Sequence, residues 1–308
     1  MKILITGGGG FIGSFLAEQL SKNHNVVVLD HGKRYRILKK KIKKNIEFVI
    51  GDISDEKILD RIFKKNIEVV IHLAGSLGNN ACMNNPVDAV LSHVHGTHLL
   101  IKKSRECQIK RFIFASSQAV YSTFKIRKSR LNENMKLEPD DLYGILKSVA
   151  ENDIIESGIN YVILRLANVY GLNKNFSQQG GAIMNFINAV RKKSKISIFG
   201  SGKQKIDYID LNDVLECINI ILNNSKLKKE IFNVGSGELN SIMNITKIIS
   251  YIGQKNFGYS TKVTKIPAPG GKIWPDRLMS INKIKRMTGW KPKVSLKQGI
   301  EKLMEYEV

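Results

Sequence analysis

A glycine run near the start of the chain is the feature that most restricts how it can fold. The sequence TGGGGFIG at Thr6–Gly13 separates an apolar segment, Lys2–Thr6, from one with apolar residues at helical spacing, Phe11–Lys22. Glycines between a strand and a helix let the backbone approach a pyrophosphate at the helix N-terminus. Asp30 ends the next apolar segment about 20 residues later, as a dinucleotide-binding βαβ unit requires. The sequence therefore predicts a dinucleotide site; a turn that serves packing alone is the alternative.

Apolar strand-like segments alternate with helical ones through the first half of the chain. We expect strands at Asn25–Asp30, Ile46–Ile50, Glu68–Leu73, Arg111–Ser116 and Tyr161–Leu166, and helices at Asp55–Lys64, Val87–Cys107 and Leu142–Ser157. This alternation is typical of a parallel sheet covered by helices on both faces. The prediction is an α/β, Rossmann-type doubly wound parallel sheet at 1–168, completed by parts of 205–235. A smaller C-terminal α/β lobe at 169–308 would mainly bind substrate.

The net charge of 49 − 27 = +22 raises the question of a nucleic-acid partner. The lysines are scattered along the chain, and the one dense basic run, 33–44, lacks the interleaved aromatics of a single-strand stacking platform. We therefore expect no nucleic-acid partner. Hydrophobic residues make up 43% and charged residues 25%, which excludes intrinsic disorder. No apolar run approaches the roughly 20 residues that cross a bilayer, so no membrane association is expected.

The cysteine and histidine patterns argue against disulfides and metal sites. Cys82, Cys107 and Cys217 form no CxxC pair, so neither a disulfide framework nor a cysteine zinc site is expected. His93 and the nearby His95 and His98 do not share one helical face and are interpreted as packing or interface residues. The N-terminus lacks a signal-peptide pattern. We expect a cytoplasmic protein without a metal.

A Tyr-x-x-x-Lys pair places both side chains on one helical face, but the pattern alone is uninformative in a lysine-rich chain. It occurs at Tyr35/Lys39, Tyr121/Lys125, Tyr143/Lys147, Tyr170/Lys174 and Tyr251/Lys255. Only Tyr143/Lys147 begins a long predicted helix that follows the fifth strand, whose end carries Ser116 and Ser117. Ligands of open parallel sheets bind at the carboxyl ends of the strands. Context therefore selects Tyr143 and Lys147.

Several motifs together resemble the extended short-chain dehydrogenase/reductase family. They are the glycine turn and Asp30, GDI at 51–53, HLAG at 72–75, SSQAVY at 116–121 and YGILK at 143–147. Further along, RLANVYG at 165–171 and GWKPKVSLKQGI at 289–300 resemble its nucleotide-sugar epimerase/dehydratase branch. The resemblance is collinear over essentially the whole chain.

The resemblance implies three catalytic residues: Tyr143 as general base or acid, Lys147 as its activator and Ser117 as the partner hydroxyl. A free phenol has a pKa of about 10, and lowering it by about 3 units costs about 4 kcal/mol. An exposed helical pair supplies only a few tenths of a kcal/mol. Lys147 must therefore act in a partly desolvated site, aided by the positive ring of oxidised cofactor.

The implied cofactor is NAD, with contacts at Gly7, Gly10, Phe11, Ile12, Gly13, Asp30, Asp52, Ile53, Leu73, Ala74, Gly75, Tyr143 and Lys147. Asp30 can accept hydrogen bonds from ribose hydroxyls and would repel a 2′-phosphate, which favours NAD over NADP. Lys33 and Arg34 could offset that repulsion. For Asp52, a contact to the adenine amino group competes with a turn or cap role.

The chain departs from the family pattern at three points, one of which is His93, where relatives usually carry asparagine. Dehydratases carry an Asp-Glu pair directly after the residue matched by Ser117; here Gln118 and Ala119 stand there, so a 4,6-dehydratase is not expected. Ile206 occupies the position of an arginine that often binds the substrate diphosphate. The remaining substrate-binding candidates are Asn168, Lys205 and Arg277. A turn-forming Asn168 and a surface Arg277 are the alternatives.

These features together predict an NAD-dependent 4-epimerase of a nucleotide-diphosphate sugar. A nucleotide-sugar C4 dehydrogenase or ketoreductase uses the same three residues and remains open. A non-catalytic NAD- or RNA-binding protein on the same fold is the third alternative. Because relatives often pair through a four-helix bundle, we also expect a homodimer through the helices at Val87–Cys107 and Leu142–Ser157.

Overall fold

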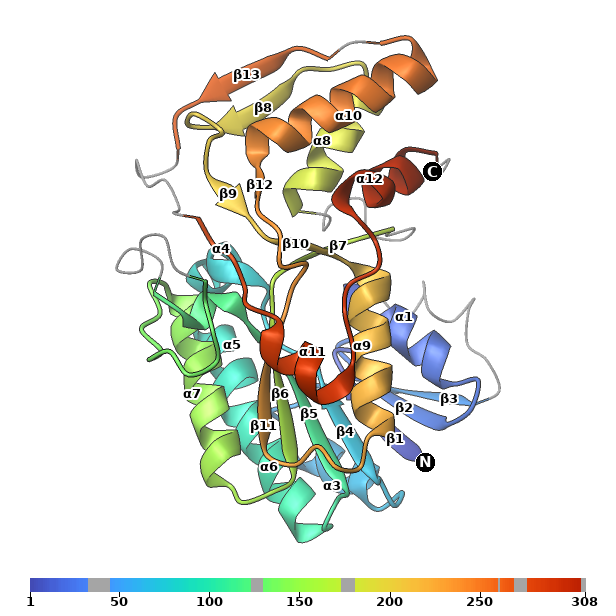
Figure 1. Cartoon of the computed structure of the whole chain (residues 1–308). Helices are drawn as coiled ribbons and strands as arrows, with labels where there is room; N and C mark the ends of the chain where they lie inside the picture. The colour runs from blue at the N-terminus through green and yellow to red at the C-terminus, as the bar shows by residue number, and fades with distance from the viewer. Residues whose placement is uncertain (33–44, 123–129, 173–180, 260, 269–275, 306–308) are drawn as a thin grey trace. The chain divides into compact units, whose positions relative to one another are not determined.

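The computed structural model describes residues 1–32, 45–122, 130–172, 181–259, 261–268 and 276–305. These residues belong to two compact units (Figure 1). The first unit comprises 1–122, 135–166 and 219–232, and the second comprises 123–134, 167–218 and 233–308. The basic run at 33–44 lies outside the described residues. The division of the chain at residue 168 stays a prediction.

A seven-stranded sheet forms the centre of the first unit, in the order β11-β6-β5-β4-β1-β2-β3 (Figure 1). Its strands are β1 (Lys2–Thr6), β2 (Asn25–Asp30), β3 (Ile46–Ile50), β4 (Val69–His72), β5 (Arg111–Ser117), β6 (Tyr161–Leu166) and β11 (Glu230–Val234). Neighbouring strands from β6 to β3 pair in parallel. The predicted Rossmann-type α/β sheet is confirmed.

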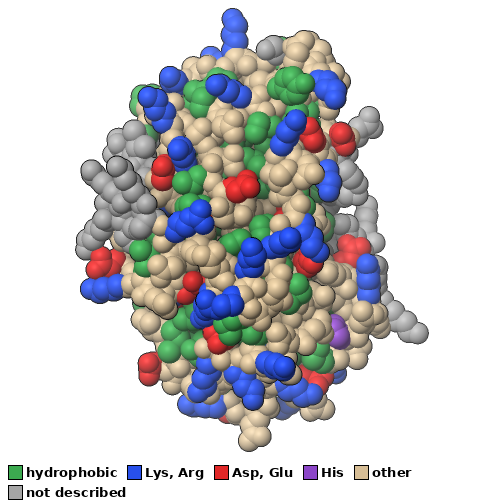
Figure 2. Space-filling view, viewed as in Figure 1, with side chains coloured by type: hydrophobic (Ala, Val, Ile, Leu, Met, Phe, Trp, Pro, Cys, Tyr) green, Lys and Arg blue, Asp and Glu red, His purple; other side chains and the backbone are tan. Residues whose placement is uncertain are grey.

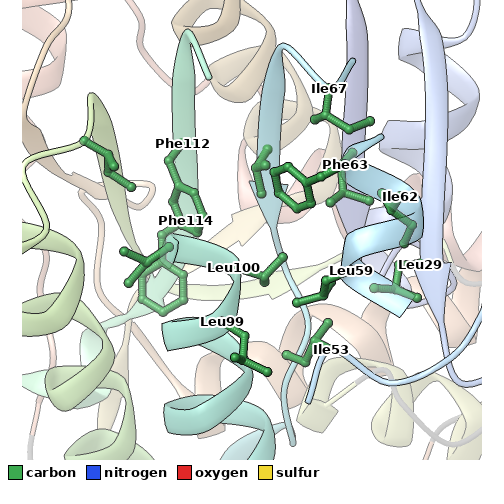
Figure 3. Packing of buried hydrophobic residues seen from close by; sticks show 14 of the residues in the cluster. Leu29, Ile53, Leu59, Ile62, Phe63, Ile67, Leu99, Leu100, Phe112 and Phe114 are labelled. Carbon is green, nitrogen blue, oxygen red and sulfur yellow. The ribbon is translucent and has the colours of Figure 1, made fainter. Parts of the chain in front are cut away.

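Both faces of this sheet are buried along the central strands β1, β2 and β4, in which successive residues are mostly apolar. One face packs on α3 (Glu56–Phe63), α6 (Gly96–Glu106) and α7 (Leu142–Glu156). Figure 3 shows Phe112 and Phe114 of β5 facing Leu99 and Leu100 of α6. Ile3 and Val28, which alternate to the other face, are equally buried. The core therefore fixes the strand ends, at which the predicted site residues lie.

The helix predicted at Val87–Cys107 is present at 86–106, but it contains a π-helical turn that the sequence did not predict. A short helix α4 (Gly78–Asn84) precedes α5 (Pro86–Val90), which runs through a π-helical turn, Leu91–His95, into α6. Pro86 begins α5, where its missing N–H costs no hydrogen bond. Single π-turns are frequent at functional sites, and this one carries His93.

A buried arginine connects the last segment of the first unit, 219–232, to the central sheet. Arg111, at the start of β5, is 5% exposed. Its guanidinium donates hydrogen bonds to four backbone carbonyls, those of Ile221, Leu222, Asn224 and Leu227. Two of them lie in the last turn of α9 (Leu211–Asn223), whose final carbonyls have no partner within the helix. The cation therefore closes that helix end.

The second unit combines short strand pairs with helices. The strands are β7 (Asn168–Tyr170) with β10 (Tyr208–Asp210), β8 (Ile196–Phe199) with β13 (Val263–Ile266), and β9 (Lys205–Ile206) with β12 (Asn240–Ser241). The helices are α8 (Gly181–Arg191), α10 (Ile242–Phe257), α11 (Asn282–Thr288) and α12 (Leu296–Glu305), together with most of α9. Apolar residues of α8, α10 and α12 form one core cluster with Tyr170 and Tyr208.

Candidate functional site

A cavity of about 510 Å³ opens at the carboxyl ends of the strands in the first unit. It brings together most of the predicted cofactor residues: Gly7, Gly10, Asp30, Asp52, Ile53, Leu73, Ala74 and Gly75. The other five predicted cofactor residues do not line it: Phe11, Ile12 and Gly13 lie in the first turn of α1 (Phe11–Leu20), and Tyr143 and Lys147 lie on α7. Ser76, Asp88 and Ser92, which the sequence did not single out, also line its wall.

The glycine turn excludes side chains because backbone surrounds it. Gly7 has φ +68°, and a Cβ there would lie 2.7 Å from the Ala74 nitrogen. A Cβ on Gly13 would lie 2.4 Å from the Gly7 carbonyl oxygen. Gly10 stands at the start of α1 without a capping side chain, so the N–H groups of the first turn are available to an anion. This turn fits the pyrophosphate of a dinucleotide.

Two carboxylates face the cavity from the ends of β2 and β3. The Gly9 N–H donates to Asp30 Oδ2 at 2.9 Å, which fixes the carboxylate beside the glycine turn. Asp52 Oδ1 accepts from the N–H and the hydroxyl of Ser54, both at 2.7 Å. Asp52 therefore forms a turn while it lines the cavity, and its contact with an adenine stays a prediction.

The three predicted catalytic residues lie together where β5 meets α7. Asp141 caps α7 by accepting from the Gly144 N–H at 2.8 Å, which places Tyr143 in the first turn. The Ser117 Oγ accepts from the Ala119 N–H at 3.1 Å. Ser117 also lies near enough to Tyr143 for a side-chain hydrogen bond that lowers the pKa of the phenol. Lys147 is 4% exposed, and its Nζ donates to the Ala115 carbonyl at 2.8 Å. The same Nζ lies 6.0 Å from the centre of the Tyr143 ring.

Burial dominates the acid–base properties of this set. It raises the pKa of Tyr143 to about 12, against the effect of the hydrogen bond with Ser117. Burial also lowers the pKa of Lys147 to about 8, while the Glu151 carboxylate opposes that change. The desolvated lysine that the sequence argument required is present. The pKa of the Tyr143 phenol, however, is not lowered, because Lys147 is directed to the Ala115 carbonyl. A further positive charge near the phenol is needed to lower it.

His93 is a neighbour of the tyrosine that the sequence argument missed. Its ring meets the Tyr143 ring edge-on, with centroids 5.7 Å apart, and its Nε2 donates to the Ser76 carbonyl at 3.0 Å. Burial lowers the pKa of His93 to about 3, so the imidazole is neutral at working pH. His93 therefore connects Tyr143 to the wall of the cavity. The histidine at a position where relatives carry asparagine was the signal available in the sequence.

The second unit gathers the three substrate-binding candidates around one buried acid, Asp207. The Asn168 N–H donates to the Asp207 carbonyl at 3.2 Å, and the Asp207 N–H donates to the Arg277 carbonyl at 3.2 Å. The Arg277 N–H in turn donates to the Lys205 carbonyl at 3.1 Å. The Asp207 carboxylate accepts from the N–H groups of Ser236, Gly237 and Met279. Their contact with a substrate stays a prediction.

Charged side chains and potential metal ligands are dispersed among the described residues (Figure 2). Lys and Arg side chains are dispersed over the face shown in Figure 2, among hydrophobic and uncharged ones. The described residues contain no group of three or more His, Cys, Asp or Glu side chains that could hold a metal ion. His98 instead lies 3.1 Å from Asp153 on α7. None of the described helices is long and apolar enough to span a membrane.

The sequence and the structure are similar to known nucleotide-sugar enzymes. A Methanocaldococcus jannaschii protein provisionally named UDP-glucose 4-epimerase is 33% identical over 310 residues, covering 99% of this chain and 97% of its own. The Thermotoga maritima UDP-glucose 4-epimerase, solved with UDP-glucose, has a TM-score of 0.89 at 29% identity, covering 99% of this chain and 98% of its own. The Bacillus cereus UDP-glucuronic acid 4-epimerase, solved with UDP-glucuronic acid and NAD, has a TM-score of 0.86 at 26% identity, with the same coverage.

Residues 3–235 match the family model of the NAD dependent epimerase/dehydratase family. This match spans the glycine turn, the cofactor cavity and the catalytic set. It confirms the family resemblance and the choice of NAD as cofactor. The chain belongs to the NAD dependent epimerase/dehydratase family.

Proposed function

We propose that this protein is a nucleotide-sugar 4-epimerase that uses NAD, with a UDP-hexose as its substrate. The carrying observation is that Ser117, Tyr143 and Lys147 lie together, and that His93 links Tyr143 to the cavity wall. At the positions of the dehydratase acids, Gln118 and Ala119 supply no proton donor or acceptor of suitable pKa. The epimerases among its relatives support the same reading.

The residues of this chain have separate parts in such a reaction. The glycine turn and Asp30 would hold the pyrophosphate and a ribose of NAD. When bound, NAD supplies a hydride acceptor and a positive ring. Tyr143 takes the proton of the sugar 4-hydroxyl and returns it, Ser117 orients that oxygen, and the Lys147 ammonium stabilises the phenolate. Asn168, Lys205 and Arg277 are the proposed contacts of the substrate diphosphate.

Turnover without added cofactor tests this function. Purified protein is incubated with UDP-glucose, UDP-galactose or UDP-glucuronic acid, and the 4-epimers are separated by chromatography. An epimerase converts many equivalents of sugar per protein, because the hydride is returned in each cycle. Conversion that stops after one equivalent per protein would instead identify a C4 dehydrogenase. Absence of any reaction with these sugars, while NAD is bound, would contradict both functions.

The activity should decline above about pH 8. Tyr143 needs the ammonium form of Lys147, which is complete well below the lysine pKa of about 8 and is lost as the pH rises through it. At pH 9 about 10% of the lysine stays protonated, so kcat should fall about tenfold from its plateau. The kcat profile between pH 6 and 10 measures this. In Lys147→Arg the residual activity should lack the decline, and a wild-type profile flat to pH 10 would contradict the assignment.

We also propose a homodimer formed through the helices beside the catalytic set. On α7, Ile145 and Val149 lie one turn apart and are 46% and 40% exposed. Val87, Val90 and Leu91 on the adjoining helix are also exposed. Such a group of apolar side chains on two neighbouring helices is typical of a protein–protein interface.

Val149→Glu should dissociate this dimer. A carboxylate buried in an apolar interface costs about 3 kcal/mol, which weakens association by about 100-fold. Sedimentation velocity at micromolar concentration should show a dimer for the wild type and a monomer for the variant. The matched control is Val263→Glu, at an exposed valine of β13. A monomeric wild type, or a dimeric Val149→Glu, would contradict the proposed interface.

A cytoplasmic location remains part of the proposal. Cys82, Cys107 and Cys217 all carry free thiols, and two of them are buried. Free thiols are the usual state of cysteine in a reducing compartment.

A further inference from the structure

A buried ion pair lies directly beneath the catalytic residues. Glu151 of α7 and Arg165 of β6 are 0% and 3% exposed. Arg165 Nη2 donates to Glu151 Oε2 at 2.7 Å, and its Nε lies 3.1 Å from both carboxylate oxygens. Burial of two charges costs free energy that their attraction repays only partly, and apolar replacements of such pairs are often as stable. Stability alone therefore gives no sufficient reason for this pair.

The pair holds both ends of the segment that contains Ser117. The Ser116 hydroxyl donates to Glu151 Oε1, immediately before the catalytic serine. Arg165 Nη1 donates to the Tyr121 hydroxyl at 2.8 Å, immediately after the 3₁₀ turn Gln118–Val120. The guanidinium also lies over the Tyr121 ring, 5.0 Å from its centre. Ser117 is thus fixed between two side chains that the ion pair anchors.

The same pair acts on Lys147. Glu151 follows Lys147 by one helical turn on the buried face of α7. The carbonyl that holds the lysine belongs to Ala115, the residue next to Ser116. The Glu151 carboxylate also raises the pKa of Lys147 against the effect of burial. The ion pair therefore holds the segment that contains Ser117, and it lies next to Lys147 and to the end of β5 that binds this lysine.

We propose that Glu151 and Arg165 are positioning residues, whose ion pair holds in place the segment of Ser117 and the strand end that binds Lys147, for the reaction at Tyr143. This inference rests on the proposed epimerase function for its kinetic readout. Neither Glu151 nor Arg165 is proposed to contact substrate or cofactor.

The test separates charge from shape with the double variant Glu151→Gln/Arg165→Met. Glutamine can still accept the Ser116 hydrogen bond, and no unpaired charge remains buried, as it would in either single variant. Glu156→Gln makes the same chemical change at an exposed position of α7 and is the control. Thermal unfolding and the amount of bound NAD establish that each variant is folded.

Two measurements, kcat and the pH of its alkaline decline, distinguish a positioning role of this ion pair from a merely structural one. In the folded double variant, kcat for UDP-glucose epimerisation should fall at least tenfold, and its alkaline decline should move to lower pH by half a unit or more. Glu156→Gln should leave both unchanged. Wild-type kcat with an unmoved alkaline limb in the folded double variant would overturn the proposal. If the double variant does not fold, the dependence of kcat on pH is measured on Glu151→Gln at low temperature. An alkaline decline at the wild-type pH in that variant would also overturn the proposal.

A spectroscopic measurement keeps this inference distinct from the proposed function. Lys147 is titrated by heteronuclear NMR of its side-chain nitrogen, as the difference between each protein and its Lys147→Arg counterpart. Loss of the Glu151 charge should move the Lys147 titration to lower pH by half a unit or more, because the Glu151 carboxylate favours the ammonium form. An inactive wild type would overturn the epimerase function, but the titration would still test whether Glu151 and Arg165 are positioning residues. An unchanged titration would overturn the positioning alone.

Discussion

Tyr143→Phe should lower kcat for sugar epimerisation by about 100- to 10,000-fold, the range that a positioned acid–base group contributes. The variant retains the ring and its edge-on contact with His93 and loses the hydroxyl that pairs with Ser117. Bound NAD and the unfolding temperature should therefore stay close to those of the wild type. Steady-state kinetics and the ratio of bound NAD to protein measure the two effects.

Tyr251→Phe is the matched control for this experiment. Tyr251 also belongs to a Tyr-x-x-x-Lys pair on a helix, α10, but its side chain is 66% exposed. Its removal should leave kcat unchanged, which shows that the surroundings and not the four-residue spacing make the tyrosine reactive. A Tyr143→Phe variant with more than a tenth of wild-type kcat would contradict the assignment of Tyr143.

Gly7→Ala should abolish retention of NAD. The new Cβ would meet the Ala74 nitrogen at 2.7 Å and the Leu73 carbonyl carbon at 2.9 Å, so the turn and the loop after β4 must separate. Both are part of the cavity wall. The positive φ costs about 1–2 kcal/mol and the overpacking a further 1–3 kcal/mol. NAD released from purified protein and quantified by mass spectrometry should fall at least tenfold, and urea unfolding should show the lost stability.

Gly158→Ala separates these two costs. Gly158 has φ +78°, close to that of Gly7, and no atom within 4 Å of an added Cβ. Its replacement should cost only the backbone strain of about 1–2 kcal/mol and leave bound NAD unchanged. Equal NAD content in Gly7→Ala and Gly158→Ala would contradict the role of Gly7 in the cofactor site.

Local sequence signals predicted much of the first unit and little of the contacts within its site. β1, β2, β3 and β6 have the predicted bounds, because short apolar runs end at glycine or polar residues. The helix predicted at Val87–Cys107 is present within one residue at each end, but its π-turn was not predicted, since a π-turn has the same composition as the α-helix around it. The contact of His93 with Tyr143 joins residues 50 positions apart in the chain and depends on how the helices pack.

The second unit was harder to predict for a related reason. Strands such as β9 and β12 have two residues each, too few for any periodicity. Asp207 directly follows β9, and its carboxylate accepts hydrogen bonds from the N–H groups of Ser236, Gly237 and Met279. A single aspartate in the sequence does not reveal that it will be buried among backbone donors. The site candidates Lys205 and Arg277 came from the family resemblance and not from the local pattern.

The carbonyl cluster around Arg111 bears on how the chain folds during synthesis. The guanidinium belongs to the fifth strand, yet its four acceptors lie more than 100 residues later. A ribosome-bound chain that has emerged only as far as residue 218 lacks the acceptors of this cation, and one edge of its central sheet lacks β11. The first unit therefore reaches its final state only after residues 167–218 of the second unit have been translated.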